Sequence, residues 1–335
     1  MKKLVVKENY SSKLDIYQTQ VAIKLIKDYF EKELAKSLNL IRVSAPLFVK
    51  KSSGLNDNLN GYERPVNFDI KDLEEEVEVV QSLAKWKRYA LAKYDIHVHK
   101  GIYADMNAIR RDEELDNLHS AYVDQWDWEK SILKEDRTLS YLFNEVNKIY
   151  EVIKSTERLI SEKYEGFAAI LPQNITFIST CELENMYPNL SRKEREDEIV
   201  RKYKAVFLYK IGWPLKDNKP HDGRASDYDD WNLNGDILLY YDVLDCAFEI
   251  SSMGIRVDEN SIVKQINYKN EAEKLNNPYV EAILNHKLPY SIGGGIGQSR
   301  LCMYFLKKIH IGEVQTSLWD DEEIEYLKKF NINLL

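Results

Sequence analysis

Four glycines and an arginine lie close together near the end of the sequence, in SIGGGIGQSRLCM (residues 291–303). Glycine lets the backbone approach a ligand closely and adopt positive φ, and a neighbouring cation favours an anionic ligand such as a phosphate. A dinucleotide fingerprint would need a glycine at Gln298, and no Gly-Lys-Ser/Thr of a Walker A loop follows. The remaining pattern, G-x-G-x-G-x-x-R, predicts either a flexible phosphate-binding loop that ends at Arg300 or a glycine-rich hairpin that leads into a core helix.

Residues 122–129 alternate as a strand does, and the two faces differ in chemistry. Gln125, Asp127 and Glu129 share one face, and two tryptophans share the other. The polar face indicates either a hydrogen-bonding site or an ordinary solvent-facing strand surface.

A second strand-like run, residues 246–253, precedes an arginine. The same alternation places Glu249 and Ser251 on one face, and Arg256 follows shortly after. A carboxylate, hydroxyl groups and a guanidinium so close together could hold a magnesium–phosphate group, or they could form a surface salt bridge.

Three cations lie near the start of a predicted helix. Ser82 is the expected N-cap of a helix that continues to Tyr94, and Lys85, Lys87 and Arg88 occupy its first turns. The helix dipole opposes each cation there by about 0.3–1 kcal/mol. Either an anion compensates these charges or they form a solvated helix face.

Two further segments carry charge in a loop-like context. Arg110 begins a stretch that reaches His119 just before the strand at 122–129. The run DYDDW contributes Asp227, Asp229 and Asp230, which could bind a metal or an amine, although such clusters are usually exposed turns.

Composition sets the class of protein. A chain of 335 residues with 44% hydrophobic residues can bury a substantial core, and its net charge of −8 argues against a broad nucleic-acid-binding surface. Three widely spaced cysteines predict neither a disulfide framework nor a zinc site. Neither a signal-peptide apolar region nor an apolar run of membrane-spanning length is present, so we expect a cytoplasmic protein.

The predicted elements form one α+β domain over residues 1–335. Long helices are expected at 16–38 and 139–164, and Ser191-x-x-Glu194 is typical of a capping box. Residues 40–48 are expected to form an edge or interface strand, because Pro46 cannot donate to a central ladder. Further strands are expected at 77–80, 121–129, 175–179, 205–211, 236–241 and 246–253.

Three of these segments resemble, in order, the signature motifs of class II aminoacyl-tRNA synthetases. The helix and strand up to Pro46 resemble motif 1, the dimer-forming element; the segment from Arg110 through Gln125 resembles motif 2; and residues 293–300 resemble motif 3. SLAKWKR, HSAYVDQWDWE, LNGDI, FEISSMGIRV and GGGIGQSRL more closely resemble ammonia-dependent aspartate–ammonia ligase, and the similarity covers nearly the whole chain. The resemblance implies a mostly antiparallel sheet flanked by helices and a homodimer.

The same resemblance implies a ligase reaction. The side-chain carboxylate of L-aspartate would attack ATP to give β-aspartyl-AMP and pyrophosphate, and ammonia would then displace AMP. Arg110 would contact the α-phosphate, Arg300 the γ-phosphate, and Glu249 a Mg²⁺ ion. Implied catalytic residues are Asp57, Arg110, Asp127, Asp229 and Arg300; implied substrate residues are Lys87, Gln125, Ser252 and Arg256; implied ATP residues are Arg110, Asp236, Gly293, Gly295, Gly297 and Arg300, with Asp236 also expected at the magnesium.

The proposed chemistry is physically reasonable for these residues. Two anions meet in the first step, so cations must offset their repulsion. Ammonium, with a pKa near ~10 if it resembles lysine, must lose a proton, and Asp57, Asp127 and Asp229 are all candidates for accepting it. A mobile segment at residues 50–61 is expected to exclude water from the acyl-adenylate.

Three alternative functions would each require sequence features of their own. A tRNA-charging enzyme would need an anticodon-binding module, which we do not expect here, so no nucleic-acid partner is expected. A non-catalytic regulator would be expected to lose charged site residues, yet Arg110, Glu249 and Arg300 are all present. A glutamine-dependent synthetase would be expected to carry an N-terminal cysteine, whereas Lys2 follows Met1.

Overall fold

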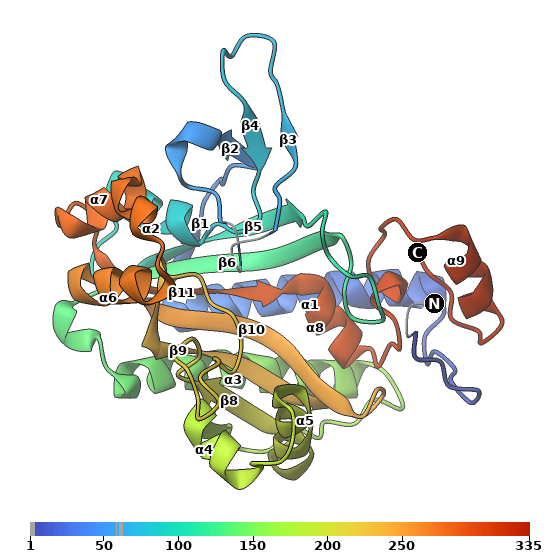
Figure 1. Cartoon of the computed structure of the whole chain (residues 1–335). Coiled ribbons are helices and arrows are strands. Elements are labelled where there is room, and N and C mark those ends of the chain that lie inside the picture. Colours follow the sequence, from blue (N-terminus) through green and yellow to red (C-terminus); the bar gives the residue numbers. More distant parts are fainter. Residues whose placement is uncertain (1–3, 58, 60–62) are drawn as a thin grey trace.

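The structure, a computed structural model, describes residues 4–57, 59 and 63–335. Within these residues, eight strands form the main sheet in the order β1-β5-β6-β11-β10-β9-β8-β7 (Figure 1). The inner pairings are antiparallel, whereas β1 pairs with β5 and β7 with β8 in parallel. The strands are β1 (Leu40–Arg42), β5 (Gly101–Ile109), β6 (Tyr122–Ile132), β11 (Tyr290–Gly297), β10 (Cys246–Arg256), β9 (Asp229–Tyr241), β8 (Ala205–Tyr209) and β7 (Thr176–Ser179).

A small second sheet rises above the main one at the top of Figure 1. It consists of β2 (Phe48–Lys50), β4 (Val77–Val79) and β3 (Asn67–Phe68), in the order β2-β4-β3. The prediction of one strand over residues 40–48 was wrong, because β1 and β2 belong to different sheets. Pro46 lies between them, where its missing N–H removes no ladder hydrogen bond.

Helices flank the main sheet, as expected for an α+β fold. They are α1 (Ile16–Leu38), α2 (Ala84–Lys93), α3 (Leu139–Lys163), α4 (Thr180–Met186), α5 (Arg192–Tyr203), α6 (Glu259–Lys269), α7 (Pro278–Leu284), α8 (Gln298–Phe305) and α9 (Asp321–Lys328). Short 3-10 turns occupy Lys51–Ser53, Lys134–Asp136, Ala272–Asn276 and Ile311–Glu313. No helix in the described part of the chain is both long and apolar enough to cross a membrane.

The two long helices cover one face of the main sheet, behind it in Figure 1. Both predicted long helices are confirmed, and α1 starts with a capping box at Asp15. A buried stripe on α1 joins the largest core, where Phe30 stacks on Trp126 with ring centroids 5.1 Å apart. The period of the buried residues therefore fixes which face of α1 meets β6.

The opposite face of the sheet is covered by α2 near β5 and by α4 and α5 near β8 and β9, and it also carries polar side chains. On β5, Tyr103 packs with α1, while Ile102 and Ala104 pack with apolar residues in and around α2. The predicted capping box at Ser191 is confirmed. The N-cap of α2 is Leu83, one residue after the predicted Ser82, but the Ser82 hydroxyl accepts a hydrogen bond from the Ala84 N–H over 3.1 Å. The single-domain prediction for residues 1–335 remains a prediction.

Candidate active site

A cavity of about 710 Å³ lies over the face of the sheet that α1 and α3 leave free. Strands β6, β9, β10 and β11, the start of α8 and the loops before β6 and β9 all contribute to its wall. The structure brings most of the predicted site residues to this wall: Asp57, Lys87, Arg110, Gln125, Asp127, Asp229, Glu249, Ser252, Arg256, Gly295, Gly297 and Arg300. Gly293 and Asp236 do not line the cavity, but each adjoins a residue that does: Gly293 precedes Gly294, and Asp236 binds Arg224.

The glycine cluster forms a strand in the interior of the sheet. Its residues pair with β10 on one side and β6 on the other, so neither the flexible loop nor the hairpin forms, although the predicted core helix follows directly as α8. Positive φ occurs, among the glycines that the structure describes, at Gly54, Gly166 and Gly212, none of which belongs to β11. Conformational freedom therefore does not explain these glycines.

Close approach of neighbouring side chains explains them. A Cβ at Gly295 would lie 2.5 Å from Gln125 Oε1 and 2.8 Å from Asp127 Oδ1. A Cβ at Gly293 would lie only 2.0 Å from Glu129 Oε2. The polar side chains of β6 fold across β11, and any larger residue there would displace them.

The alternation predicted for β6 is confirmed and gives the site its floor. Trp126 and Trp128 are fully buried in the core under α1, while Gln125 and Asp127 line the cavity on the other face. Glu129 lies on the same face as the latter pair but is completely buried, so the solvent-facing interpretation was wrong.

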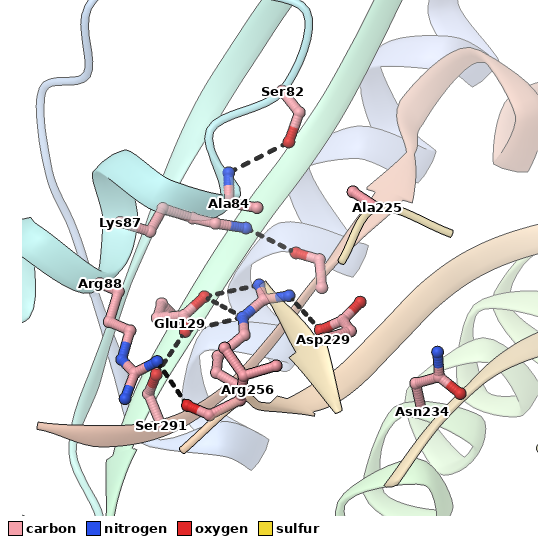
Figure 2. A network of polar contacts seen from close by, with 12 residues as sticks. Ser82, Ala84, Lys87, Arg88, Glu129, Ala225, Asp229, Asn234, Arg256 and Ser291 are labelled. Carbon is pink, nitrogen blue, oxygen red and sulfur yellow. Dashed lines mark hydrogen bonds and ion pairs between the residues drawn. The ribbon is translucent and has the colours of Figure 1, made fainter. Parts of the chain in front are cut away.

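Glu129 and Asp229 bind opposite sides of Arg256 (Figure 2). Arg256 Nε donates to Glu129 Oε1 over 2.9 Å, its Nη2 donates to Oε2 over 2.7 Å, and its Nη1 donates to Asp229 Oδ1 over 2.5 Å. Ser291 Oγ donates a further hydrogen bond to Glu129. Burial would raise the pKa of Glu129, but Arg256 outweighs it and the pKa is lowered. This network holds Asp229, whose pKa burial raises despite Arg256, at the edge of the cavity.

The three cations in the first turns of α2, Lys85, Lys87 and Arg88, are all buried, so the solvated-face interpretation was wrong. Lys87 Nζ lies 3.3 Å from Asp127 Oδ1, and burial lowers the pKa of Lys87. Lys85 Nζ lies 2.6 Å from Asp227 Oδ2, while Arg88 donates to backbone carbonyls. The compensating anions of both lysines are therefore protein carboxylates.

The acidic run DYDDW is a strand start and not an exposed turn. Asp229 and Asp230 begin β9, and both are buried together with Asp227. Arg137 binds Asp230 over 2.9 Å. Each of the three carboxylates therefore meets a buried cation, which the local sequence did not show.

Among the residues that the structure describes, Asp57 makes no ion pair, whereas Asp127 and Asp229 each make one. Its side chain is buried at the cavity wall, and Oδ1 accepts from the Leu59 N–H over 2.9 Å. Oδ2 has no hydrogen-bond partner among the described residues. Burial raises its pKa to about 6, against the opposing charge of Lys85. The segment predicted to be mobile, residues 50–61, lies partly outside the described residues.

A bulge in β10 changes which hydroxyl accompanies Glu249. The pairing with β9 shifts between Glu249 and Ser251, so the strict alternation predicted from the sequence fails there. Ser252, and not Ser251, lines the cavity with Glu249. Ser251 is buried below it.

Asp236 and Glu249 are the residues that fit a magnesium ion. Asp236 Oδ1 is buried without a hydrogen-bond partner in the described chain, and Arg224 Nη2 donates to Oδ2. Burial raises the pKa of Asp236 to about 7; Arg224 opposes this, and the charge of Glu249 adds to it. The described residues hold no cluster of three or more metal-binding side chains. Two carboxylates suit Mg²⁺, which takes its other ligands from phosphates and water.

Two arginines keep donors for a ligand. Arg300 Nη1 donates to the backbone carbonyl of Glu249 over 3.0 Å. Arg110 lies 3.8 Å from Glu113, and its Nε has no hydrogen-bond partner among the described residues. Within the described residues, neither guanidinium forms a short bidentate ion pair like the one that holds Arg256, so both are suited to phosphate oxygens.

Sequence reasoning missed several residues of this site. Glu129 was placed on the correct face but not assigned to the site. Arg224, which lines the cavity and binds Asp236, has no distinguishing pattern around it. Lys85 and Asp227 were each noted, but nothing local indicated that they pair with each other.

The fold is that of a class II aminoacyl-tRNA synthetase-like catalytic domain. Asparaginyl-tRNA synthetase from Pyrococcus horikoshii, solved with asparaginyl-adenylate, superposes with a TM-score of 0.66 at 16% identity, covering 90% of this chain and 70% of that one. The corresponding Entamoeba histolytica enzyme gives 0.63 at 14% identity, covering 90% and 66%. At such identities the likeness concerns the fold.

The sequence comparisons identify the family. The profile of the aspartate-ammonia ligase family matches residues 17–331. Aspartate–ammonia ligase of Ruminiclostridium cellulolyticum is 57% identical and covers 100% of both chains, and that of Fusobacterium nucleatum is 58% identical over 97% of this chain and 99% of its own. The chain belongs to the aspartate–ammonia ligase family and is therefore a ligase, as the sequence motifs predicted.

Proposed function

We propose that this site makes L-asparagine from L-aspartate, ATP and ammonia through β-aspartyl-AMP, releasing AMP and pyrophosphate. The observation that carries the proposal is the composition of the cavity wall. It combines two arginines with donors left for phosphate and three carboxylates suited to an amine, above a floor of fixed polar side chains. Membership of the aspartate–ammonia ligase family supports the same reaction.

In the first step, an oxygen of the aspartate β-carboxylate attacks the α-phosphorus of ATP and the bond to the β-phosphate breaks. Arg110 and Arg300 offset the repulsion between the anions and stabilise the charge that develops on the phosphoryl oxygens. Mg²⁺ held by Asp236 and Glu249 would supply further positive charge at the phosphates. Lys87 and Gln125 lie on the cavity wall beside Asp127, where they can orient the amino acid.

In the second step, ammonia attacks the acyl carbon and the bond from that carbon to AMP breaks. The ammonium that enters must first lose a proton. Asp127 and Asp229 are already paired with Lys87 and Arg256, whereas Asp57 has an oxygen without a partner among the described residues and a pKa raised to about 6 by burial. We therefore favour Asp57 among the three candidate bases.

We also propose a homodimer formed through α1 and the segment around β1 and β2. Support comes from exposed apolar side chains there: Tyr17 is 78% exposed, Ile41 58% and Leu47 53%. A monomeric mass by sedimentation at micromolar concentration would count against the dimer.

We further propose a cytoplasmic enzyme without a nucleic-acid partner, since ATP is its co-substrate and its net charge is −8.

A product assay with aspartate, ATP, Mg²⁺ and ammonium tests the reaction. We expect asparagine, AMP and pyrophosphate, and with ammonium omitted we expect aspartate-dependent exchange of pyrophosphate into ATP. A requirement for tRNA in this exchange would indicate a synthetase that needs tRNA for activation. ADP as the sole nucleotide product, or equal use of glutamine in ammonia-free buffer, would refute the mechanism.

A further inference from the structure

Asp124 joins four parts of the fold that are far apart in the sequence. It lies on β6 beside the polar floor of the cavity and is buried. Lys27 of α1 donates to its Oδ2 over 3.0 Å, and the Ser299 hydroxyl of α8 donates to the same oxygen over 2.8 Å. The backbone N–H of Ser299 and the side-chain amide of Gln315 donate to its Oδ1 over 3.0 and 3.2 Å.

These four donors occupy the hydrogen-bonding capacity of the carboxylate. An ionised carboxylate offers about four lone-pair sites, two on each oxygen. Asp124 lines the cavity, yet each oxygen already accepts two hydrogen bonds from the protein. A substrate group would have to displace one of them, so the arrangement indicates a residue that holds other residues in place.

The element it holds most directly is the first turn of α8. Gly297 is the N-cap of this helix and has no side chain to accept a hydrogen bond, and the first turn contains no acidic residue. The N–H groups of a first turn need acceptors from elsewhere, and a negative charge is favoured there. Asp124 of β6 supplies both the acceptor and the negative charge. It accepts from the backbone N–H of Ser299, the residue immediately before Arg300.

Arg300 is fixed at both of its ends as a result. Its backbone belongs to the turn that Asp124 binds, and its guanidinium donates to the carbonyl of Glu249 on β10. We infer that Asp124 is a positioning residue for Arg300, holding the start of α8 on β6 and linking it through Lys27 to α1. This inference rests on the proposed function, in which Arg300 contacts ATP.

The link to α1 is partly shielded from water. The side chains of Lys27 and Asp124 are 29% and 7% exposed, respectively. Although burial opposes the charge of Lys27, Asp124 outweighs it and the pKa of Lys27 is raised. Lys27, which lies on the helix proposed to form the dimer, is thus paired with Asp124, the carboxylate that positions Arg300.

A similar but more exposed connection lies one residue earlier on α8. Gln298 Nε2 donates to Asp105 Oδ1 over 3.2 Å, and Arg42 of β1 binds the other oxygen of Asp105. The side chain of Arg42 is 60% exposed, so this ion pair contributes little. We expect the link through Asp124 to dominate.

Steady-state pyrophosphate exchange, with ATP and aspartate varied separately, tests the inference. In Asp124→Asn, one oxygen becomes an amide that cannot accept from its donors. We expect the KM for ATP to rise roughly tenfold, as for loss of a hydrogen bond to a charged group, with the KM for aspartate within about twofold. Ser299→Ala, which keeps the backbone N–H but loses the hydroxyl, should show a smaller change of the same kind.

Lys27→Met tests the connection to α1, and Lys24→Met is its matched control, because Lys24 lies on the same helix in an exposed pair with Asp28. We expect Lys27→Met to raise the KM for ATP severalfold and Lys24→Met to leave it unchanged. Thermal unfolding of each variant identifies a misfolded protein. If Asp124→Asn does not fold, Ser299→Ala and Lys27→Met still decide the question.

The outcomes separate this inference from the proposed function. A wild-type enzyme without aspartate-dependent exchange would refute the proposed function itself. A wild-type enzyme that exchanges normally, with folded Asp124→Asn and Lys27→Met variants whose KM for ATP is unchanged, would refute only the positioning role. Equal increases in the KM for ATP and for aspartate would also refute it, because they would indicate a general loss of site structure.

Discussion

Replacing Asp57 by asparagine should abolish asparagine synthesis and at the same time stabilise the folded protein. Burial raises the pKa of Asp57 to about 6, from 3.8 in a solvent-exposed reference. The folded protein therefore holds this proton more tightly than the unfolded chain. Stability falls as the pH rises from about 4 through about 6, and the full loss is present above that range. Asparagine carries no charge to bury and avoids this loss.

The magnitude follows from the difference between the two pKa values. One pKa unit corresponds to about 1.4 kcal/mol, so a shift from 3.8 to about 6 corresponds to about 3 kcal/mol at pH 8. At pH 5 the Asp57 side chain is still mostly protonated in the folded state, so its destabilisation of the fold is about half of the value at pH 8. The asparagine carbonyl can keep the hydrogen bond from the Leu59 N–H.

Urea unfolding of wild type and Asp57→Asn at pH 5 and pH 8, at one protein concentration, measures the effect. We expect the variant to be more stable at both pH values, and by more at pH 8. Asp72→Asn is a suitable control, because Asp72 is exposed in the turn between β3 and β4. A variant that is less stable than wild type at pH 8, or equally stabilised at both pH values, would refute the reasoning.

Three further predictions concern the wall of the cavity. Gly293→Ala should lower the free energy of unfolding by about 1–3 kcal/mol in urea titrations, because its Cβ would meet Glu129 Oε2 at 2.0 Å and Arg256 Nη2 at 2.6 Å; a neutral effect would contradict this packing. Arg300→Ala should lower kcat/KM for ATP, with a loss of transition-state stabilisation of about 2–4 kcal/mol and little change in aspartate binding; unchanged ATP kinetics would remove Arg300 from the site. Chelation of Mg²⁺ should stop pyrophosphate exchange, and Asp236→Asn should raise the Mg²⁺ concentration needed to restore it; an identical requirement in the variant would place the ion elsewhere.

Elements whose cause is local were predictable from the sequence. The apolar period of α1 and the alternation of β6 follow from each segment's own residues, and both are confirmed. The motif resemblance added the order of the catalytic segments, which placed most of the site residues on one cavity wall. Such patterns succeed because helix and strand geometry repeat over short distances in the chain.

Elements whose cause lies in another strand were not predictable in this way. Because of a bulge in β10, Ser252 lines the cavity where strict alternation predicted Ser251, since one extra residue reverses the alternation beyond it. The glycines of β11 look like a flexible loop in isolation. Their actual cause is the set of side chains on β6, and the pairing of β6 with β11 appears only in the folded sheet.

The charge pairing of the site was decided by tertiary structure alone. Arg256 meets Glu129 across 127 residues of sequence, and Lys85 meets Asp227 although each was open to a solvent-exposed interpretation. The sequence by itself determined which charged groups are available and on which faces of their elements they lie. Only the folded sheet decided which of them neutralise one another and which, like Arg110 and Asp57, keep an atom without a hydrogen-bond partner in the described part of the chain, because burial makes an ion pair depend on the exact approach of distant strands.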